Sequence, residues 1–405
     1  MPISSVALIV MAMLLTALLL EPVARRLHLP FSAALVAGGF AGAQLIVSAG
    51  FDTGLRWYHF HDLVFFVFLP ALIFESAIHL NARLLLRNLL PVLLLALPFL
   101  LVSTLITAAL LFYGIGHASG FPCITALICG ALLSATDPVA VTDIAKRLPV
   151  PKRLLTMMEG ESLTNDATTI VLFMLLTGVA ITDSNHIDLA SAGWEFLVLA
   201  FGGLGIGLVV GVIAGWLTRR LRQPVITSLL AAYGAYLLAE TQLHVSGIMA
   251  CLACGLWLGR SLETTTAEHR PAVSDWWENL GWIANSALFL LAGATITLNM
   301  FEERWLAMLI GIGAALLTRL ISVWSACSLA SVIPGQQKIS GDFKLLMTIG
   351  GLRGAVTLAL VLSLPTELEG WWTVQATAYG VVLFSLFIQA PFIEPLLMRL
   401  NRRLT

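Results

Sequence analysis

One short stretch, residues 160–170 (GESLTNDATTI), places several oxygen-bearing side chains at the start of a long apolar segment. Glu161 and Asn165 are four residues apart, and on a helix such residues share a face. Ser162 and Asp166 form the next row, about 100° around the helix. Hard cations prefer oxygen ligands, so this polar stripe indicates a cation site. A plain interfacial helix end fits less well, because Asp166 lies a turn further into apolar sequence.

An Asp-Pro pair interrupts a second apolar segment, SATDPVAV. Pro138 has no N–H and disfavours helix at the residue before it. We therefore expect the helix to unwind at Thr136 and Asp137, which frees backbone carbonyls. Irregular backbone at membrane depth is tolerated where it lines a cavity or is buried in protein. The simpler alternative is a proline kink in which Asp137 caps the second half-helix, and it also leaves a charge beside any bound ion.

A third apolar segment, IGGLRGAVTL at residues 349–358, surrounds an arginine with glycines. Gly350, Gly351 and Gly354 flank Arg353, and glycine weakens a helix interior. This helix is therefore also expected to break near its middle.

The composition places all these segments in a membrane. Of the 405 residues, 59% are hydrophobic and 11% are charged, whereas a soluble protein has about 25% charged residues. The apolar runs are long and do not alternate with a period of two, which excludes a β-barrel and predicts an all-α integral membrane protein. Five cysteines lie in apolar stretches, and we interpret them as small apolar residues of helices, not as a redox or metal pair.

We predict thirteen transmembrane helices. They lie near residues 4–22, 31–49, 62–80, 89–113, 121–144, 155–180, 194–217, 224–242, 245–260, 277–297, 305–332, 343–363 and 372–396. The first has no basic residue before it and no small-residue cleavage site after it, so we expect a mature span and not a signal peptide. The tail RLNRRLT follows the last span directly, and we expect no soluble domain beyond it.

The basic residues predict the orientation, because cytoplasmic loops are enriched in Lys and Arg. With the N-terminus outside and the C-terminus in the cytoplasm, eighteen of the 22 basic residues lie on the cytoplasmic side. These are Arg25, Arg26, Arg83, Arg87, Lys146, Arg147, Lys152, Arg153, Arg219, Arg220, Arg222, Arg260, Arg270, Lys338, Lys344, Arg399, Arg402 and Arg403. Arg56 and Arg304 lie outside, and Arg319 and Arg353 lie within spans.

The two interruptible helices are the fifth and the twelfth spans. If span seven is a linker, spans 1–6 and 8–13 form two six-helix units, and both broken helices are the fifth member of their unit. Because corresponding helices are seven spans apart, an odd number, the second unit has the opposite orientation in the membrane. Paired interrupted helices in corresponding positions are typical of inverted-repeat transporters.

Charged residues at membrane depth are costly and mark functional sites. The predicted spans contain four acidic residues and two basic ones. The acids are Glu75, Asp137, Glu161 and Asp166, and the bases are Arg319 and Arg353. At least one carboxylate is therefore left to hold a proton or another cation. If H⁺ and a monovalent cation compete for Asp166, and alternating access exposes it to each side in turn, the chain is an antiporter and not an enzyme.

The motifs ATDPVAV, GESLTND and GGLRGAV, in this order and on these spans, resemble the Na⁺/H⁺ exchanger branch of the monovalent cation/proton antiporters. The resemblance covers nearly the whole chain. It implies exchange of Na⁺, Li⁺ or sometimes K⁺ for H⁺ without a cofactor, in the cell (inner) membrane, as a homodimer.

The resemblance also implies roles for single residues. Asp166 is expected to bind the cation and the proton, with Na⁺ held also by Ser162 and the Thr136 backbone and with Asp137 acting through charge or water. Asn165 matches the asparagine that precedes the binding aspartate in electroneutral members of the family, which exchange one cation for one proton. Glu161 is expected to form an ion pair with Arg319, and Arg353 is expected to offset the charge of the half-helix ends. Glu75 is expected to line the access path.

In this family the transporting core consists of spans 4–6 and 11–13. For this chain that implies core segments at 89–180 and 301–405, and scaffold segments at 1–88 (spans 1–3) and 181–300 (spans 7–10), with the two broken helices crossing. Such members often carry a long cytoplasmic regulatory tail.

Three alternatives stay open. The same scaffold can exchange K⁺ for H⁺, because ligand type does not separate Na⁺ from K⁺. A proton or cation channel, or a sensor that does not transport, is a more remote possibility. An intramembrane aspartyl hydrolase using Asp137 and Asp166 fits poorly, because Asn and Arg companions do not favour a shared proton. A serine hydrolase using Ser162 would lack a histidine at membrane depth.

Overall fold

The structure is a computed structural model that describes residues 3–27, 29–48, 50, 61–116, 121–145, 150–181, 189–221, 223–263, 269–333 and 338–404. Within these ranges the regular secondary structure is all helical, and the sole β-type pairing is an isolated bridge between Asp137 and Leu352. Backbone groups can be satisfied inside a bilayer by helices. The observed fold class is therefore the expected helical membrane protein.

The first half of the chain forms the helices α1 to α10, and α10 carries the polar stripe. They are α1 (Ile3–Leu27), α2 (Phe31–Ser48), the π-helical η1 (Val64–Phe68), α4 (Leu69–His79), α5 (Ala82–Arg87), α6 (Leu89–Ala96), α7 (Pro98–Gly114), α8 (Cys123–Leu132), α9 (Val139–Ala145) and α10 (Lys152–Ile181).

The second half of the chain forms the remaining helices. They are α11 (Leu189–Arg220), α12 (Pro224–Leu237), η2 (Leu238–Gln242), α13 (Gly247–Leu262), α14 (His269–Thr295), α15 (Leu298–Val332), α16 (Gly341–Gly350), α17 (Ala355–Leu362), α18 (Trp371–Phe384), η3 (Ser385–Gln389), η4 (Ala390–Phe392) and α19 (Ile393–Leu404).

Eight helical runs in the described chain are long and apolar enough to cross a membrane, and α8 and α13 are shorter apolar helices. Some boundaries differ from the sequence prediction. The helix α15 begins at Leu298, seven residues before the predicted start, and is kinked at Arg304. The predicted span 89–113 is divided at Leu97, whose backbone leaves the helical region directly before Pro98, as expected for a residue that precedes proline.

Both helices that carry the Asp-Pro and Gly-Arg motifs are interrupted. The chain leaves helix after Leu132 and resumes at Val139. It leaves helix again after Gly350 and resumes at Ala355. The amide N–H of Asp137 donates a hydrogen bond of 2.8 Å to the carbonyl of Leu352, so the two breaks meet.

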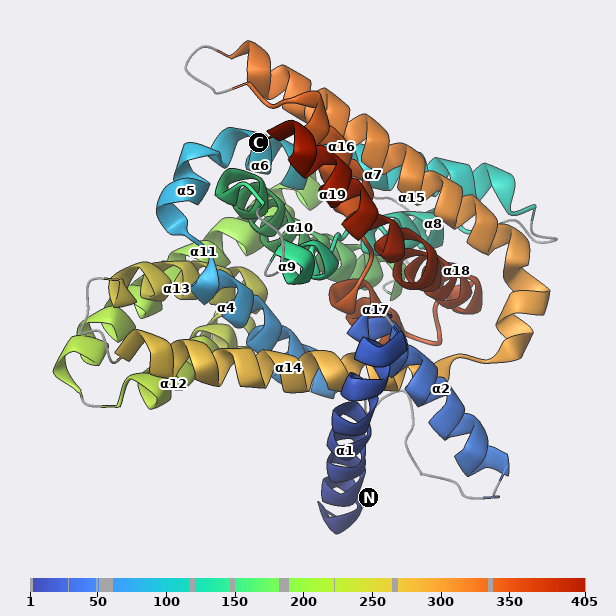
Figure 1. The fold of residues 1–405 in the computed structure, drawn as a ribbon, viewed down its shortest axis with the longest axis horizontal. Coiled ribbons are helices and arrows are strands. Elements are labelled where there is room, and N and C mark those ends of the chain that lie inside the picture. The colour runs from blue at the N-terminus through green and yellow to red at the C-terminus, as the bar shows by residue number, and fades with distance from the viewer. Residues whose placement is uncertain are drawn as a thin grey trace.

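The helix α10 lies centrally, beside these breaks (Figure 1). It packs against α6 and α8 on one side and against α4, α11 and α13 on another. The helix α15 packs against α7 and α18, and α14 packs against α2 and α4. Because α10 reaches both groups of helices, its polar residues lie at the junction between them.

Candidate ion-binding site

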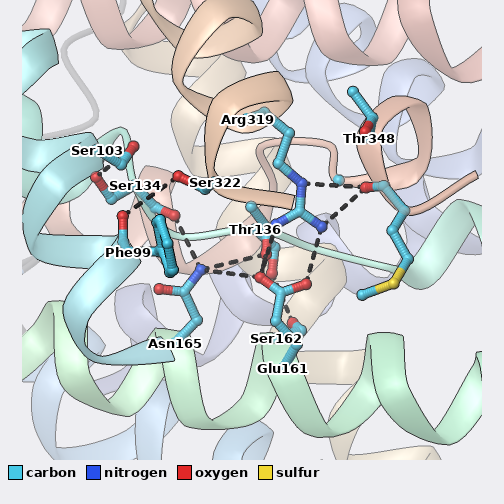
Figure 2. A network of polar contacts seen from close by, with 12 residues as sticks. Phe99, Ser103, Ser134, Thr136, Glu161, Ser162, Asn165, Arg319, Ser322 and Thr348 are labelled. Carbon is cyan, nitrogen blue, oxygen red and sulfur yellow. Dashed lines mark hydrogen bonds and ion pairs between the residues drawn. The ribbon is translucent and has the colours of Figure 1, made fainter. Parts of the chain in front are cut away.

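Glu161 and Arg319 form a buried, two-pronged ion pair. Arg319 Nη1 donates to Glu161 Oε1 at 2.7 Å and Nη2 donates to Oε2 at 2.8 Å. Their side chains are only 2% and 6% exposed. The guanidinium also donates to the Met347 carbonyl through Nε at 3.1 Å and Nη2 at 2.9 Å. This pair therefore joins α10, α15 and α16 (Figure 2), and it neutralises the Glu161 charge.

The unwound segment between α8 and α9 hydrogen-bonds to α10 beside this pair (Figure 2). Thr136 Oγ1 donates to Glu161 Oε1 at 3.1 Å. Ser162 Oγ donates to the Thr136 carbonyl at 2.6 Å. The polar stripe predicted on α10 therefore faces the backbone that Pro138 frees.

Asn165 fixes the same segment through its amide group. Its Nδ2 donates to the Ser134 carbonyl at 3.0 Å and lies 3.3 Å from Thr136 Oγ1 and 3.4 Å from Glu161 Oε1. Its Oδ1 is buried and has no hydrogen-bond partner among the described residues. Asn165 therefore acts as a donor that holds the unwound chain, and its oxygen stays unused.

Asp137 lies at the N-terminal ends of two half-helices. Its Oδ1 accepts from the Val139 N–H at 2.9 Å, at the start of α9. Its Oδ2 accepts from the Ala355 N–H at 3.4 Å, at the start of α17. Each N-terminus carries about half a positive charge, so the two together offset one carboxylate. A Cβ on Gly354 would lie 1.8 Å from Asp137 Oδ2, so the approach requires glycine there.

Arg353 lies at the C-terminal ends of two half-helices, α8 and α16. Its Nε donates to the Leu133 carbonyl at 2.6 Å, beyond the end of α8, and Nη1 donates to the Gly351 carbonyl at 3.0 Å, beyond the end of α16. Arg353 as a whole residue is 3% exposed. Each C-terminus carries about half a negative charge, so these two helix ends offset the guanidinium.

Asp166 is the carboxylate that remains. It is half-buried on α10, within hydrogen-bonding reach of the Ser162 hydroxyl and close to the carboxylates of Asp137 and Glu161. Among the described residues no Lys or Arg comes within ion-pair distance of it. Within the described part of the chain, its negative charge is therefore not offset by a basic side chain.

Glu75 lies away from this network. It is half-buried near the end of α4, with its Oε1 3.3 Å from His79 Nδ1. The contact partners that sequence reasoning missed are backbone carbonyls, those of Ser134, Leu133 and Met347. Any residue type supplies a carbonyl, so no sequence pattern could have identified them.

The chain matches the family described as sodium/hydrogen exchanger, transmembrane, over residues 10–399. It is 34% identical over 345 residues to the Na(+)/H(+) antiporter ApNhaP of Aphanothece halophytica, a match that covers 84% of this chain and 65% of that protein. It is also 34% identical to the Na(+)/H(+) antiporter NhaP of Pseudomonas aeruginosa, with 85% and 83% covered.

The fold is similar to the structure of the sodium proton antiporter MjNhaP1 from Methanocaldococcus jannaschii at pH 8. The TM-score is 0.81 at 20% sequence identity, with 98% of this chain and 99% of that chain covered. The chain spans 65% of the length of ApNhaP and 63% of that of the Low-affinity Na(+)/H(+) antiporter NhaS1 of Synechocystis. Because the family pattern extends over nearly all of its residues, the chain belongs to the sodium/hydrogen exchanger transmembrane family.

Proposed function

We propose that this chain exchanges Na⁺ or Li⁺ for H⁺ across a membrane, with the two ions competing for Asp166. One observation carries the proposal. The charges of Glu161, Asp137 and Arg353 are each offset by a partner or by helix ends, whereas no basic side chain among the described residues pairs with Asp166. A carboxylate with limited hydration prefers to be neutralised, so Asp166 holds either a proton or a cation.

The cation would be held by oxygens that already lie together. Ser162 Oγ and the Thr136 carbonyl are 2.6 Å apart, and Asp166 lies beside Ser162. These three groups supply one charged and two neutral oxygens, the ligand type that hard cations prefer. Asp137 adds negative charge nearby, directly or through a water molecule, and Asn165 holds the unwound backbone in place.

The same charges support an electroneutral exchange of one cation for one proton. Arg319 fixes the charge of Glu161 by a bidentate pair, and Asn165 has no charge. Asp166 is then the group whose occupant changes, so each half-cycle carries one positive charge. Since the empty, ionised site is the costly state, the protein changes its access side with the site occupied.

We propose the predicted architecture for this exchange. Thirteen spans in two inverted six-helix repeats would place the N-terminus outside and the C-terminus in the cytoplasm of the cell (inner) membrane. Residues 89–180 and 301–405 would form the moving core, and residues 1–88 and 181–300 the scaffold of a homodimer. The packing of α15 against α7 and α18, and of α14 against α2 and α4, supports this division.

The test is transport by the purified chain in liposomes that contain a pH dye, with the membrane potential clamped. Pulses of Na⁺ or Li⁺ should drive a pH change that is independent of the imposed potential and absent in Asp166→Asn. A response to K⁺ alone would keep the mechanism and change the substrate to K⁺. A rate that follows the potential would contradict one-for-one exchange, and proton flux without cation dependence would indicate a channel.

A further inference from the structure

We propose that His79 is a proton-controlled charge switch at the entrance to Asp166, and that it lowers cation uptake from its side of the membrane at acid pH. The proposal rests on the antiport function proposed above. It concerns a group outside the ion-binding network, at the last residue of α4.

The hydrogen bonds of the imidazole fix where each proton lies. His79 Nδ1 is 2.7 Å from the Glu75 carbonyl, and a carbonyl only accepts, so Nδ1 carries a proton in both charge states. Nε2 is 2.8 Å from Ser274 Oγ and 3.7 Å from Glu278 Oε1. The second proton therefore binds at Nε2, where rotation of the Ser274 hydroxyl is enough to accept it.

Carboxylates from three helices surround this imidazole. Glu75 is on α4 itself, with Oε1 3.3 Å from Nδ1, Glu278 is on α14, and Glu159 of α10 is close enough to interact with both Glu75 and His79. Basic side chains on neighbouring helices are exposed at Arg83 and Arg87 of α5, Lys152 of α10, Arg260 of α13 and Arg270 of α14. Arg153 of α10 is half-buried and donates to Asn88 Oδ1 at 2.8 Å. The His79 side chain is 28% exposed, so protons reach it from water.

The cluster lies at one end of the helix face that carries Asp166. Glu159, Ser162 and Asp166 follow at steps of three and four residues, so they share one face of α10. Glu159 and Asp166 are seven residues apart, which is about 10 Å along a helix. The neighbouring Gly160 packs against Leu85 at the end of the bundle where α4 finishes, so the Glu159 end of this helix face lies beside the end of α4.

The charge of His79 then sets the cation concentration at the entrance. With a neutral imidazole, three carboxylates attract cations toward the stripe. With an imidazolium, one positive charge offsets part of that field and cations enter less readily. Histidine is the side chain that ordinarily titrates between pH 5 and 8, so the switch operates in the physiological range.

The test measures the apparent KM for Na⁺ on the side to which His79 opens, at pH 6 and pH 8.5, in the reconstituted full chain. Proton competition at Asp166 raises KM at pH 6 in every variant. In His79→Gln we expect the ratio of the two KM values to fall about two- to tenfold below that of the unsubstituted chain. In His79→Lys, KM at pH 8.5 should rise toward the acid value, and added choline chloride should reduce the difference by screening.

Two further variants keep the test decisive. Glu278→Gln removes a partner of the imidazolium, so KM should rise at pH 8.5 and depend less on pH. His244→Asn, an exposed position with φ of 51° that asparagine tolerates, is the matched control and should leave the ratio unchanged. An unaltered ratio in both His79→Gln and Glu278→Gln would overturn the switch, whereas absence of antiport in the unsubstituted chain would overturn the proposed function instead.

Discussion

The backbone of Asp137 and the backbone of Leu352 are joined by a hydrogen bond of 2.8 Å between two helices that both break at that point. This contact brings two N-terminal and two C-terminal helix ends to one place. Asp137 then lies at the positive ends and Arg353 at the negative ends. The charges of Asp137 and Arg353 are therefore offset by the helix ends at the crossing. Asp166 lies beside the crossing and has no basic partner among the described residues.

Gly354→Ala should disrupt the crossing. Its Cβ would lie 1.8 Å from Asp137 Oδ2, so the aspartate must leave its place at the start of α17. Overpacking of this kind costs about 1–3 kcal/mol. We expect a lower melting temperature in detergent and slower exchange. Gly313→Ala, on α15 with nothing within 4 Å of the new Cβ, is the control, and equal effects in both variants would contradict the packing argument.

The Glu161–Arg319 pair should show strong coupling. Arg319→Met leaves a buried carboxylate without a partner, and breaking one side of a buried pair costs about 3–5 kcal/mol. The double variant Glu161→Gln/Arg319→Met removes both charges, so it should be more stable than Arg319→Met alone. Thermal unfolding of the four members of this double-mutant cycle measures the coupling. Additive effects would show that the two side chains do not depend on each other.

Much of this site could be predicted from sequence, and the limits have physical reasons. Pro138 and the glycines around Arg353 predict the two breaks, because they act on the local backbone. The same proline rule applies at Pro98, but the apolar run across it is continuous and predicts a single unbroken span. The pairing of Glu161 with Arg319, which lie far apart in the chain, followed from the family resemblance and not from any local pattern.

Arg353 should be replaceable by lysine better than by an apolar residue. Arg353→Met leaves the carbonyls of Leu133 and Gly351 without their donor and two helix ends without a positive charge. A buried polar group without its partner costs about 1–3 kcal/mol. Arg353→Lys keeps the charge but not the planar donor geometry, so its melting temperature should lie between those of Arg353→Met and the unsubstituted chain. Identical values for both variants would mean that the charge itself contributes nothing.

Cation binding to Asp166 should be visible without transport. A ligand that binds only the folded state stabilises it by about 2.7 kcal/mol at 100 times its Kd, so Na⁺ should raise the melting temperature of the purified chain. Protonation of Asp166 removes the charge that holds the cation, and the Na⁺-induced rise should therefore shrink as the pH falls. Choline at equal ionic strength controls for screening. In Asp166→Asn the rise should vanish at every pH, because no carboxylate remains for the ions to share. A rise that persists in Asp166→Asn would place the bound cation elsewhere, and one that is equal at low and high pH would show that proton and cation do not compete.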